Sequence, residues 1–373
     1  MSNNKKGAKE LFEEVIDQRL CTYCGACAGG CPYLVSYEGR IVVLDKCTIP
    51  EGKCYEYCPR TPTDINAISY QTFGEAYKDD ELGAIREVMI ARSADDHIRK
   101  RAQYGGTVTT LMSLALEEGF IDCGILAKMS DDKIPGSYLA RSKEEILQCA
   151  GTSYVAYPLL EALNHIPEES TEKLGIVGTP CQVLSLSKMK QDPPQNRVNI
   201  GNIKLLIGLF CNWALSFHEF HQFLRENLDL PKVIKFDIPP PPANQFDIYS
   251  ESGKTSLPLD EIRRYIMPAC SYCLDMTAEF ADISVGSAEG IEGWNTVIIR
   301  TKAGEDLMRL AKAKGALETE ILPDENLAHL KEAALNKKKA ALKNLVERTG
   351  NRNDFLYIYG LSEGITDKFL ENK

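Results

Sequence analysis

Seven of the 13 cysteines lie between positions 21 and 58, and their spacing is that of ligands for an iron–sulfur cluster. The first four form the run C-x2-C-x2-C-x3-C-P, with Cys21, Cys24, Cys27 and Cys31 before Pro32. In such a run three thiolates bind one cluster and the fourth binds a second cluster. A zinc ribbon is the alternative, but zinc sites use separated pairs of cysteines. The run therefore predicts iron–sulfur chemistry and electron transfer.

The second half of this cysteine-rich segment is irregular. A second regular run is replaced by Cys47, Cys54 and Cys58, so that one ligand is missing. The usual crossing pattern divides the seven cysteines into two ligand sets. The first set is Cys21, Cys24, Cys27 and Cys58, and the second set is Cys31, Cys47 and Cys54. With three thiolates, the second set leaves open a three-iron cluster, a four-iron cluster with a non-cysteine ligand, or an empty site.

Six cysteines remain in the rest of the chain. Cys123 and Cys149 lie in apolar strand and helix contexts, where a buried structural role is expected. The other four form what we call the third set: Cys181, Cys211, Cys270 and Cys273. These four could close one further four-iron cluster. A zinc site is an alternative, as is a redox-active thiol at Cys181, which begins a predicted helix.

Length and charge limit the possible partners. At 373 residues the chain has room for two or three domains. The net charge of −10 and the lack of an extended basic tract argue against a nucleic acid or an anionic membrane as partner. The odd number of cysteines and a charged amino terminus, without the apolar region of a signal peptide, indicate a reducing cytoplasm. No apolar run approaches the ~20 residues of a membrane-spanning helix, so membrane association is expected only through a partner.

From about residue 76 the sequence alternates between strand-like and helix-like segments. We expect three parts: an iron–sulfur domain at 1–75, an α/β body at 76–320 and a helical segment at 321–373. The predicted elements of the body are strands at 86–94, 123–130, 174–177, 205–210, 281–287 and 295–301 and a helix at 107–118. This alternation favours a largely parallel sheet, whose ligands gather at the carboxyl ends of the strands. Cys181 and Cys211 each follow such an end.

The sequence predicts local structure for three further segments and for one pair of residues. An amphipathic helix is expected at 1–18, and Ser142 with Glu145 is a capping box that opens a helix. The proline run that begins at 239, with the polar sequence up to about 256, predicts a rigid surface excursion or an inserted hairpin. The lysine run at 337–339 is expected on the solvated face of a helix.

Gly105 and Gly106 precede the helix predicted at 107–118. Two glycines at this position could let backbone amides approach a pyrophosphate, and a tight turn is the alternative. The sequence contains no G-x-G-x-x-G and no Walker motif, so an ordinary dinucleotide fold is not indicated. The five histidines show no metal-binding or triad spacing, and no nucleophile elbow is present. The chain is therefore predicted to move electrons rather than to hydrolyse a substrate.

Several longer motifs resemble a known protein family. They are residues 105–122 (GGTVTTLMSLALEEGFID), 140–154 (ARSKEEILQCAGTSY), 178–182 (GTPCQ), 208–211 (GLFC) and 270–301 (CSYCLDMTAEFADISVGSAEGIEGWNTVIIRT). Over about residues 76–320 the chain resembles the beta subunits of coenzyme F420-reducing hydrogenases and formate dehydrogenases. The combination with an amino-terminal cysteine module is similar to the input subunit of the dehydrogenases that oxidise reduced F420. It is also similar to chlorophyll-pathway reductases of the same superfamily.

The resemblance implies an FAD held by the body, with one four-iron cluster beside it on the third set. It also implies a group of flavin contacts. The candidates are Gly105, Gly106, Thr107, Thr109, Gly151, Thr152, Ser153, Tyr154 and Thr179. The flavin would exchange a hydride with the deazaflavin and pass single electrons to the cluster, so no side chain is expected to be catalytic.

The expected fold is therefore an α/β (α+β) flavoprotein body with a small amino-terminal bacterial-ferredoxin-like iron–sulfur domain. The expected function is that of an oxidoreductase subunit that exchanges hydride between coenzyme F420, or a similar two-electron carrier, and FAD. Electrons would pass through two or three iron–sulfur clusters, mainly 4Fe-4S, to ferredoxin or to a subunit of the hydrogenase, formate dehydrogenase or heterodisulfide reductase type. A ferredoxin-dependent reductase of a ring or double bond, and an electron relay without a free substrate, are the alternatives.

Overall fold

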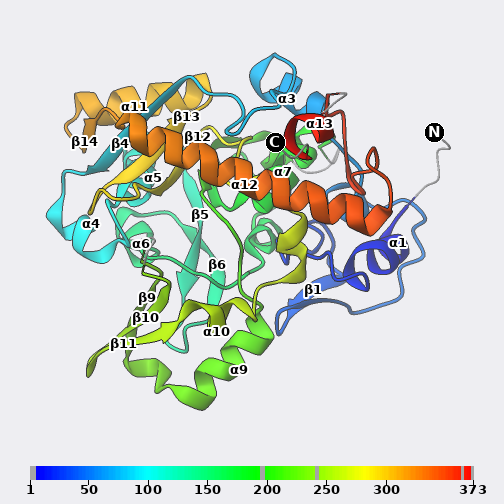
Figure 1. The fold of residues 1–373 in the computed structure, drawn as a ribbon, viewed down its shortest axis with the longest axis horizontal. Helices are drawn as coiled ribbons and strands as arrows, with labels where there is room; N and C mark the ends of the chain where they lie inside the picture. The colour runs from blue at the N-terminus through cyan, green and yellow to red at the C-terminus, as the bar shows by residue number, and fades with distance from the viewer. Residues whose placement is uncertain (1–5, 194–197, 240–242, 363–364, 371–373) are drawn as a thin grey trace.

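An eight-stranded mixed sheet forms the centre of the body (Figure 1). The computed structural model describes residues 6–193, 198–239, 243–362 and 365–370. In spatial order the strands are β14 (Leu317–Glu320), β4 (Glu87–Ser93), β13 (Asn295–Ile299), β12 (Ile283–Ser287), β8 (Ile203–Leu209), β7 (Leu174–Gly178), β5 (Cys123–Met129) and β6 (Pro135–Ala140). The six predicted strands are confirmed, whereas β6 and β14 were not predicted.

The prediction of a largely parallel sheet was wrong for the outer strands. Only β12, β8, β7 and β5 pair in parallel in this sheet, and the flanking pairs are antiparallel. The reason is the length of the connections. The loops 130–134 and 288–294 join β5 to β6 and β12 to β13, and both are too short for the crossover that parallel neighbours need. Cys181 and Cys211 nevertheless follow two adjacent parallel strands, as predicted.

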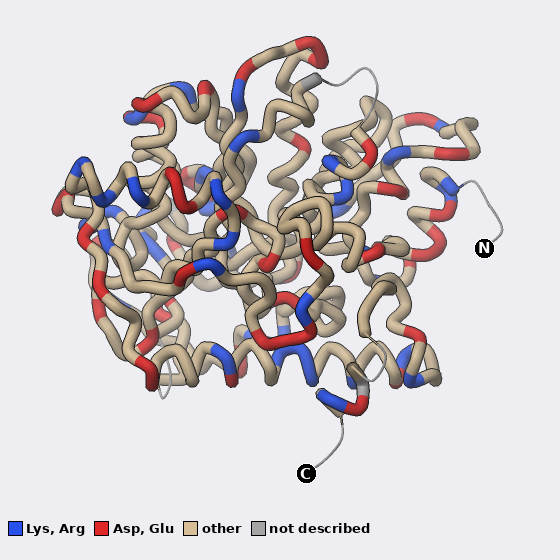
Figure 2. Tube along the Cα trace, turned by 90° about the horizontal axis from the view of Figure 1, so that it is seen from above, with Lys and Arg blue, Asp and Glu red and all other residues tan. Residues whose placement is uncertain are grey.

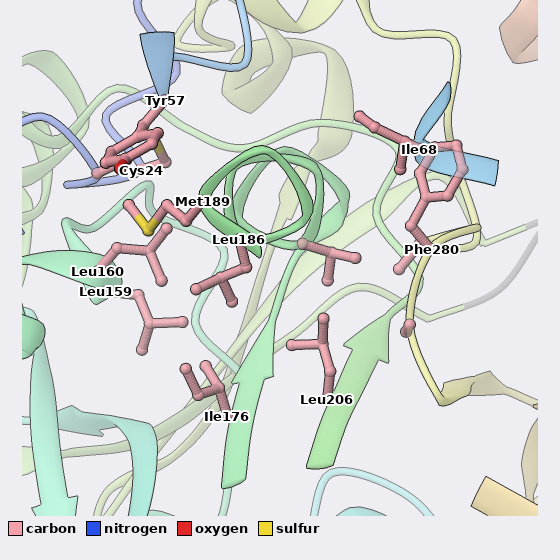
Figure 3. Packing of buried hydrophobic residues seen from close by; sticks show 14 of the residues in the cluster. Cys24, Tyr57, Ile68, Leu159, Leu160, Ile176, Leu186, Met189, Leu206 and Phe280 are labelled. Carbon is pink, nitrogen blue, oxygen red and sulfur yellow. The ribbon is translucent and has the colours of Figure 1, made fainter. Parts of the chain in front are cut away.

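Helices cover both faces of the sheet. α5 and α11 pack in one apolar cluster with Ile207, whereas α7 packs in another with Leu206. Because successive residues of a strand point to opposite faces, the two clusters lie on opposite sides of the sheet. Figure 3 shows Leu186 of α7 facing Ile176 and Leu206. The helices of this part are α4 (Asp96–Arg101), α5 (Thr107–Glu117), α6 (Lys143–Gln148), η3 (Leu159–His165), α7 (Pro180–Gln191), α8 (Val198–Gly201), η5 (Pro268–Tyr272) and α11 (Lys302–Ala313). Ser142 and Glu145 form the predicted capping box of α6.

The amino-terminal segment consists of short elements packed directly on the body. Its elements are α1 (Ala8–Leu11), the π-helix η1 (Phe12–Ile16), η2 (Ala28–Gly30), β1 (Leu34–Tyr37), β2 (Arg40–Val43), α2 (Lys53–Glu56), β3 (Thr63–Asp64) and α3 (Ile65–Phe73). Helix is thus confirmed over 8–16, and residues 1–5 of the predicted helix lie outside the described residues. Cys24, Tyr57 and Ile68 share the apolar cluster of α7 (Figure 3). The boundary at residue 75 and the ferredoxin-like character of this segment stay predictions.

A three-stranded sheet forms a separate layer beside the body. It consists of β9 (Val233–Asp237), β10 (Gln245–Ser250) and β11 (Gly253–Pro258), with η4 (Leu230–Lys232), α9 (Phe217–Asn227) and α10 (Leu259–Arg263) beside it. Phe220, Phe236 and Phe246 form its core. The antiparallel pair of β10 and β11 confirms the predicted hairpin, while residues 240–242 of the proline run lie outside the described residues.

The predicted carboxyl-terminal helix is α12 (Asp324–Thr349), which is followed by β15 (Ile358–Tyr359) and α13 (Ile365–Leu370). In Figure 1, α12 crosses the molecule from the sheet to the amino-terminal segment. Near its end Arg348 donates a hydrogen bond to the carbonyl of Gln18, and β15 pairs with β3. None of the described helices is long and apolar enough to cross a lipid bilayer. Figure 2 shows acidic and basic residues interleaved over the described part of the chain.

The lysine run of α12 is not simply a solvated face, and this prediction was wrong for two of its three residues. Lys338 is buried and lies 2.7 Å from a carboxylate oxygen of Glu279, with side-chain exposures of 5% and 2%. The Tyr77 hydroxyl donates to the same carboxylate at 2.7 Å. Lys337 is half-buried and donates to the carbonyl of Cys211, whereas Lys339 is exposed. The burial follows from the path of α12 across the body, which the charge pattern of the helix alone does not specify.

The structure explains why glycine occupies the two positions before α5. Gly106 has a φ of +75°, which glycine adopts without strain. At Gly105 an added Cβ would lie 2.8 Å from Oδ1 of Asn295 and 3.0 Å from the carbonyl oxygen of Ala91. The Thr107 side chain donates to the same carbonyl at 3.0 Å. The start of α5 is thus held tightly against β4 and β13.

Replacing Lys338 by methionine should destabilise the protein by about 3–5 kcal/mol, because the buried Glu279 carboxylate would lose its counter-charge. The double variant Lys338→Met with Glu279→Gln should recover part of this loss, since no unpaired charge would remain. Chemical denaturation of the anaerobic protein checks both values. Equal unfolding free energies for the single variant and the wild type would contradict the buried ion pair.

The substitution Gly105→Ala should lower the free energy of unfolding by about 1–3 kcal/mol, because the added methyl group has no room beside Asn295 and Ala91. Gly136 in β6 offers a matched control, because an added Cβ there would meet no atom within 4 Å. Gly136→Ala should therefore change the stability by less than about 0.5 kcal/mol. Similar losses for the two variants, measured by denaturation, would show that close packing is not the reason for Gly105.

Candidate redox site

The first cysteine set lies in the amino-terminal segment, where three members are buried and Cys21 is half-buried. Three of its members precede η2, and Cys58 follows α2. Burial, followed by the nearby thiols of Cys58 and Cys181, raises the pKa of Cys21 to about 12. The pKa of Cys27 is raised well above its ordinary value. Burial is the largest cause, and the nearby thiols of Cys21, Cys24 and Cys58 add to it. The structure therefore brings all four thiols of this set close together.

The second set lies at the edge of the same segment. Burial, followed by the neighbouring thiol of Cys31 and then by that of Cys47, raises the pKa of Cys54 to about 11. Cys47 is exposed and Cys31 is half-buried. Cys54 also contributes to the raised pKa of Cys27, so the second set lies next to the first. This set has three thiols in the structure, as in the sequence.

The third set lies where the α/β body meets the amino-terminal segment. Cys181 begins α7 directly after β7, Cys211 follows the adjacent β8, and Cys270 and Cys273 lie at η5. Burial is the largest cause of the raised pKa of Cys211. Lys337 lowers this pKa, whereas the neighbouring thiols of Cys270, Cys181 and Cys273 raise it. Two backbone hydrogen bonds hold η5 in place: Met267 donates to the Ala214 carbonyl at 2.9 Å, and Cys211 donates to the Met276 carbonyl at 2.8 Å. The four predicted residues thus come together from three separate parts of the chain.

The first and third sets are neighbours. Burial, followed by the thiols of Cys181 and Cys58, raises the pKa of Cys24. Since Cys27 of the first set is in turn close to Cys54 of the second, the sets follow one another in the order third, first, second. This order leads from the interior of the body to the exposed Cys47.

Three cationic side chains lie near these thiols: Arg60 and Lys188 are buried, and Lys337 is half-buried. The ammonium group of Lys188 donates to the Cys58 carbonyl at 2.8 Å and to the Thr61 hydroxyl at 2.9 Å, and burial lowers its pKa to about 8. Lys337 and Arg60 act on the third set. Burial alone would raise the pKa of Cys273, but these two cations outweigh it, and the pKa lies below its ordinary value. The two cations therefore favour the thiolate at Cys273, whereas burial raises the pKa of the other cysteines of the first and third sets.

The donors of the first and third sets are cysteine thiols, which are ligands of iron–sulfur clusters and also of zinc. Within the described ranges, no three His, Cys, Asp or Glu side chains converge closely enough to hold one metal ion. Backbone groups also donate to the sulfurs, as the amide of Tyr23 does to Cys21 and that of Ala214 does to Cys270, both at 3.4 Å. Ligation by these residues stays a prediction.

Cys123 and Cys149 stand apart from the three sets. Cys123 is fully buried in β5, where burial raises its pKa to about 11. Cys149 follows α6, and its thiol donates to the carbonyl of Glu145 at 3.4 Å. Both positions agree with the expected structural role.

The predicted flavin contacts fall into three groups in the structure. Gly105, Gly106, Thr107 and Thr109 are buried at the start of α5. Gly151 and Thr152 are exposed, and the hydroxyl of Ser153 bonds to the backbone of Val155. Thr179 lies with the third set, where its hydroxyl is 3.3 Å from the sulfur of Cys181. Flavin binding by these residues stays a prediction.

A polar group around Asp237 was missed from the sequence. Tyr154 accepts a hydrogen bond from the Ile238 amide at 3.1 Å, and Gln103 donates to the Asp237 carboxylate at 2.5 Å. Burial, followed by Asp237, raises the pKa of Tyr104 to about 12. The end of β9 thus joins the loop before Gly105 to the segment 151–154. No sequence signal pointed to this group, because Asp237 belongs to the inserted sheet.

Tyr157 connects this polar group with the cysteines. Its carbonyl accepts a hydrogen bond from Gln182 in the first turn of α7 at 3.2 Å. Burial, followed by Cys181 and Cys211, raises the pKa of its hydroxyl. The segment 151–157 therefore leads from Asp237 to the third set.

Comparison with known proteins gives matches over most of the chain. The family described as "Coenzyme F420 hydrogenase/dehydrogenase, beta subunit" is matched in two parts, its amino-terminal part by residues 88–164 and its carboxyl-terminal part by residues 171–325. The coenzyme F420 hydrogenase subunit beta of Methanothermobacter thermautotrophicus is 34% identical over 72% of this chain and 96% of that protein. The coenzyme F420-dependent sulfite reductase of Methanocaldococcus jannaschii is 29% identical over 93% of this chain. The chain spans 53% of that relative's length.

A solved structure gives the same result. A chain of the F420-reducing [NiFe] hydrogenase complex from Methanosarcina barkeri, solved as a xenon derivative, superposes with a TM-score of 0.67 at 34% sequence identity. The match covers 74% of this chain and 96% of that chain. From the two family matches, the sequence identity and the shared fold, we conclude that this chain belongs to the coenzyme F420 hydrogenase/dehydrogenase beta subunit family of oxidoreductase components.

Proposed function

We propose that the chain is an iron–sulfur flavoprotein subunit that transfers electrons between coenzyme F420, or a similar hydride carrier, and a partner oxidoreductase or ferredoxin. The observation that supports this most is the order of the three cysteine sets, which leads from the body to the surface. The family supports an electron-transfer role, because the names of two relatives include coenzyme F420. Three iron–sulfur clusters on the three sets would give a continuous path for single electrons.

The body would provide the end of this path that meets the hydride carrier. FAD, when bound, would supply the conversion between a two-electron hydride and the single electrons that iron–sulfur clusters carry. The candidates to hold it are the polar group around Asp237 and the segment 151–154, which lie next to one another. Tyr157 and Thr179 would form the boundary between this site and the third set.

The first and third sets would hold the two inner clusters away from water. All eight cysteines of these two sets are buried or half-buried. Their surroundings supply cations and backbone donors, and hydrogen bonds to sulfur, net charge and exposure set the potential of an iron–sulfur cluster. Lys188, Lys337 and Arg60 would all favour the reduced state of these clusters, since reduction adds negative charge.

The second set would exchange electrons with the partner. Cys47 is exposed, and several large apolar side chains beside it are exposed as well. Leu44 and Ile49 keep 64% and 63% of their surface exposed, and Tyr33 keeps 54%.

Anaerobically purified protein should contain flavin and about 11–12 irons per chain if all three sets are filled. It should oxidise reduced F420 with a one-electron dye as acceptor, and an excess of NADPH in place of F420 serves as the specificity control. Turnover separates this proposal from a relay without a free substrate, because turnover requires a substrate site. About four irons without flavin, or no oxidation of either reduced F420 or NADPH, would contradict the proposal. Cys273→Ser should lose about four irons, whereas Cys149→Ser, outside the three sets, should keep its iron content.

A further inference from the structure

Arg60 lies between the first and the third cysteine set. It follows Cys58 by two positions, and 4% of its side chain is exposed. It also lines a small cavity together with Cys181, Cys273 and Tyr357. Its charge acts on members of both sets, Cys21 and Cys58 on one side and Cys181 and Cys273 on the other. One guanidinium group therefore faces both predicted inner clusters.

The bonds of Arg60 leave its charge without a carboxylate partner. Its Nη1 atom donates to the Tyr357 hydroxyl, and its Nη2 atom donates to the Ala269 carbonyl at 3.0 Å. The Nε atom is buried without a hydrogen-bond partner. Among the residues the structure describes, no carboxylate lies within ion-pair distance of this guanidinium. An unpaired buried charge destabilises a fold. We therefore expect the thiolates, and the clusters they would hold, to supply the negative charge that balances Arg60.

The other two cations, Lys188 and Lys337, each lie near one cysteine set only. Lys188 lies near Cys58 and Cys24 of the first set, and Lys337 lies near Cys273, Cys211 and Cys270 of the third. Each of them thus acts on one set. Arg60 is held by Tyr357, whose ring lies 4.6 Å from the guanidinium and whose hydroxyl donates to the carbonyl of Tyr272, beside Cys273, at 2.6 Å. The carboxyl-terminal segment therefore fixes the guanidinium at the contact between the two sets.

We propose that Arg60 is a positioning residue that acts as the shared counter-charge of the two inner clusters and keeps the reduction potentials of both higher than they would be without it. This inference rests on the proposed function. Reduction adds an electron to a cluster, and a buried cation stabilises the added charge. Because the guanidinium lies between the two sets, its removal should shift two potentials in the same direction. A cation that serves one set would shift one of them.

The test is a redox titration of the anaerobic full chain, followed by electron paramagnetic resonance, in the wild type and in the variants Arg60→Met and Arg60→Lys. Both variants lose the planar guanidinium and its bonds, but only methionine removes the charge. We expect more negative potentials for both inner clusters in Arg60→Met and potentials close to those of the wild type in Arg60→Lys. The cluster on the second set provides an internal reference, because Arg60 is not among the main influences on the thiol of Cys54, and its potential should stay close to that of the wild type.

Arg92→Met is the matched control, because it removes the same charge from a partly exposed site on β4, where Arg92 pairs with Glu318. It should leave all potentials unchanged. Loss of the two inner clusters in Arg60→Met but not in Arg60→Lys would also support the shared counter-charge. Unchanged potentials in Arg60→Met, or equal effects of methionine and lysine, would overturn this inference while the proposed function stands. A wild-type protein without iron–sulfur signals would overturn both.

Discussion

Burial of charge where the amino-terminal segment meets the α/β body is the constraint on which the rest of the structure depends. Arg60, Lys188 and Lys337 bring positive charge into the interior, where the thiols of the first and third sets surround them. Helix α7 carries Cys181 and Lys188 two turns apart, so a single helix serves both sets. Isolated cations at these depths would destabilise the fold. We therefore expect the cations and the clusters on these two sets to form one unit, in which the negative charge of the ligated clusters balances the buried cations.

This constraint explains why the amino-terminal segment is packed on the body and not joined to it by a free linker. Ser185 of α7 donates to the carbonyl of Tyr57, and Tyr57 donates to the carbonyl of Asp192, at 2.5 Å and 2.8 Å. The side chain of Asn164 bonds to the carbonyl of Ala28 beside the first set. These bonds hold the first set at a fixed position relative to the third. Electron transfer between two clusters depends on such a fixed arrangement, whereas a loosely attached module would vary the separation.

The sequence predicted the features that depend on local spacing. The ligand run from Cys21 to Cys31 is encoded by residue separation, and the apolar segments of β7 and β8 were long enough to predict their strands. Features that depend on distant contacts were missed or wrong. The buried pair of Lys338 and Glu279 results from the path of α12. The group around Asp237 arises because the inserted sheet packs beside two loops of the body. Neither relation leaves a periodic signal in the sequence.

The proposed function requires electrons to pass between the body and the second cysteine set through the first. Rapid-freeze electron paramagnetic resonance after mixing oxidised protein with reduced F420 tests the order of the clusters directly. We expect the cluster on the third set to be reduced first, followed by the cluster on the first set and any cluster on the second, where Cys47 reaches the surface. Reduction of the amino-terminal clusters before the cluster of the body, or no reduction of any cluster, would contradict it.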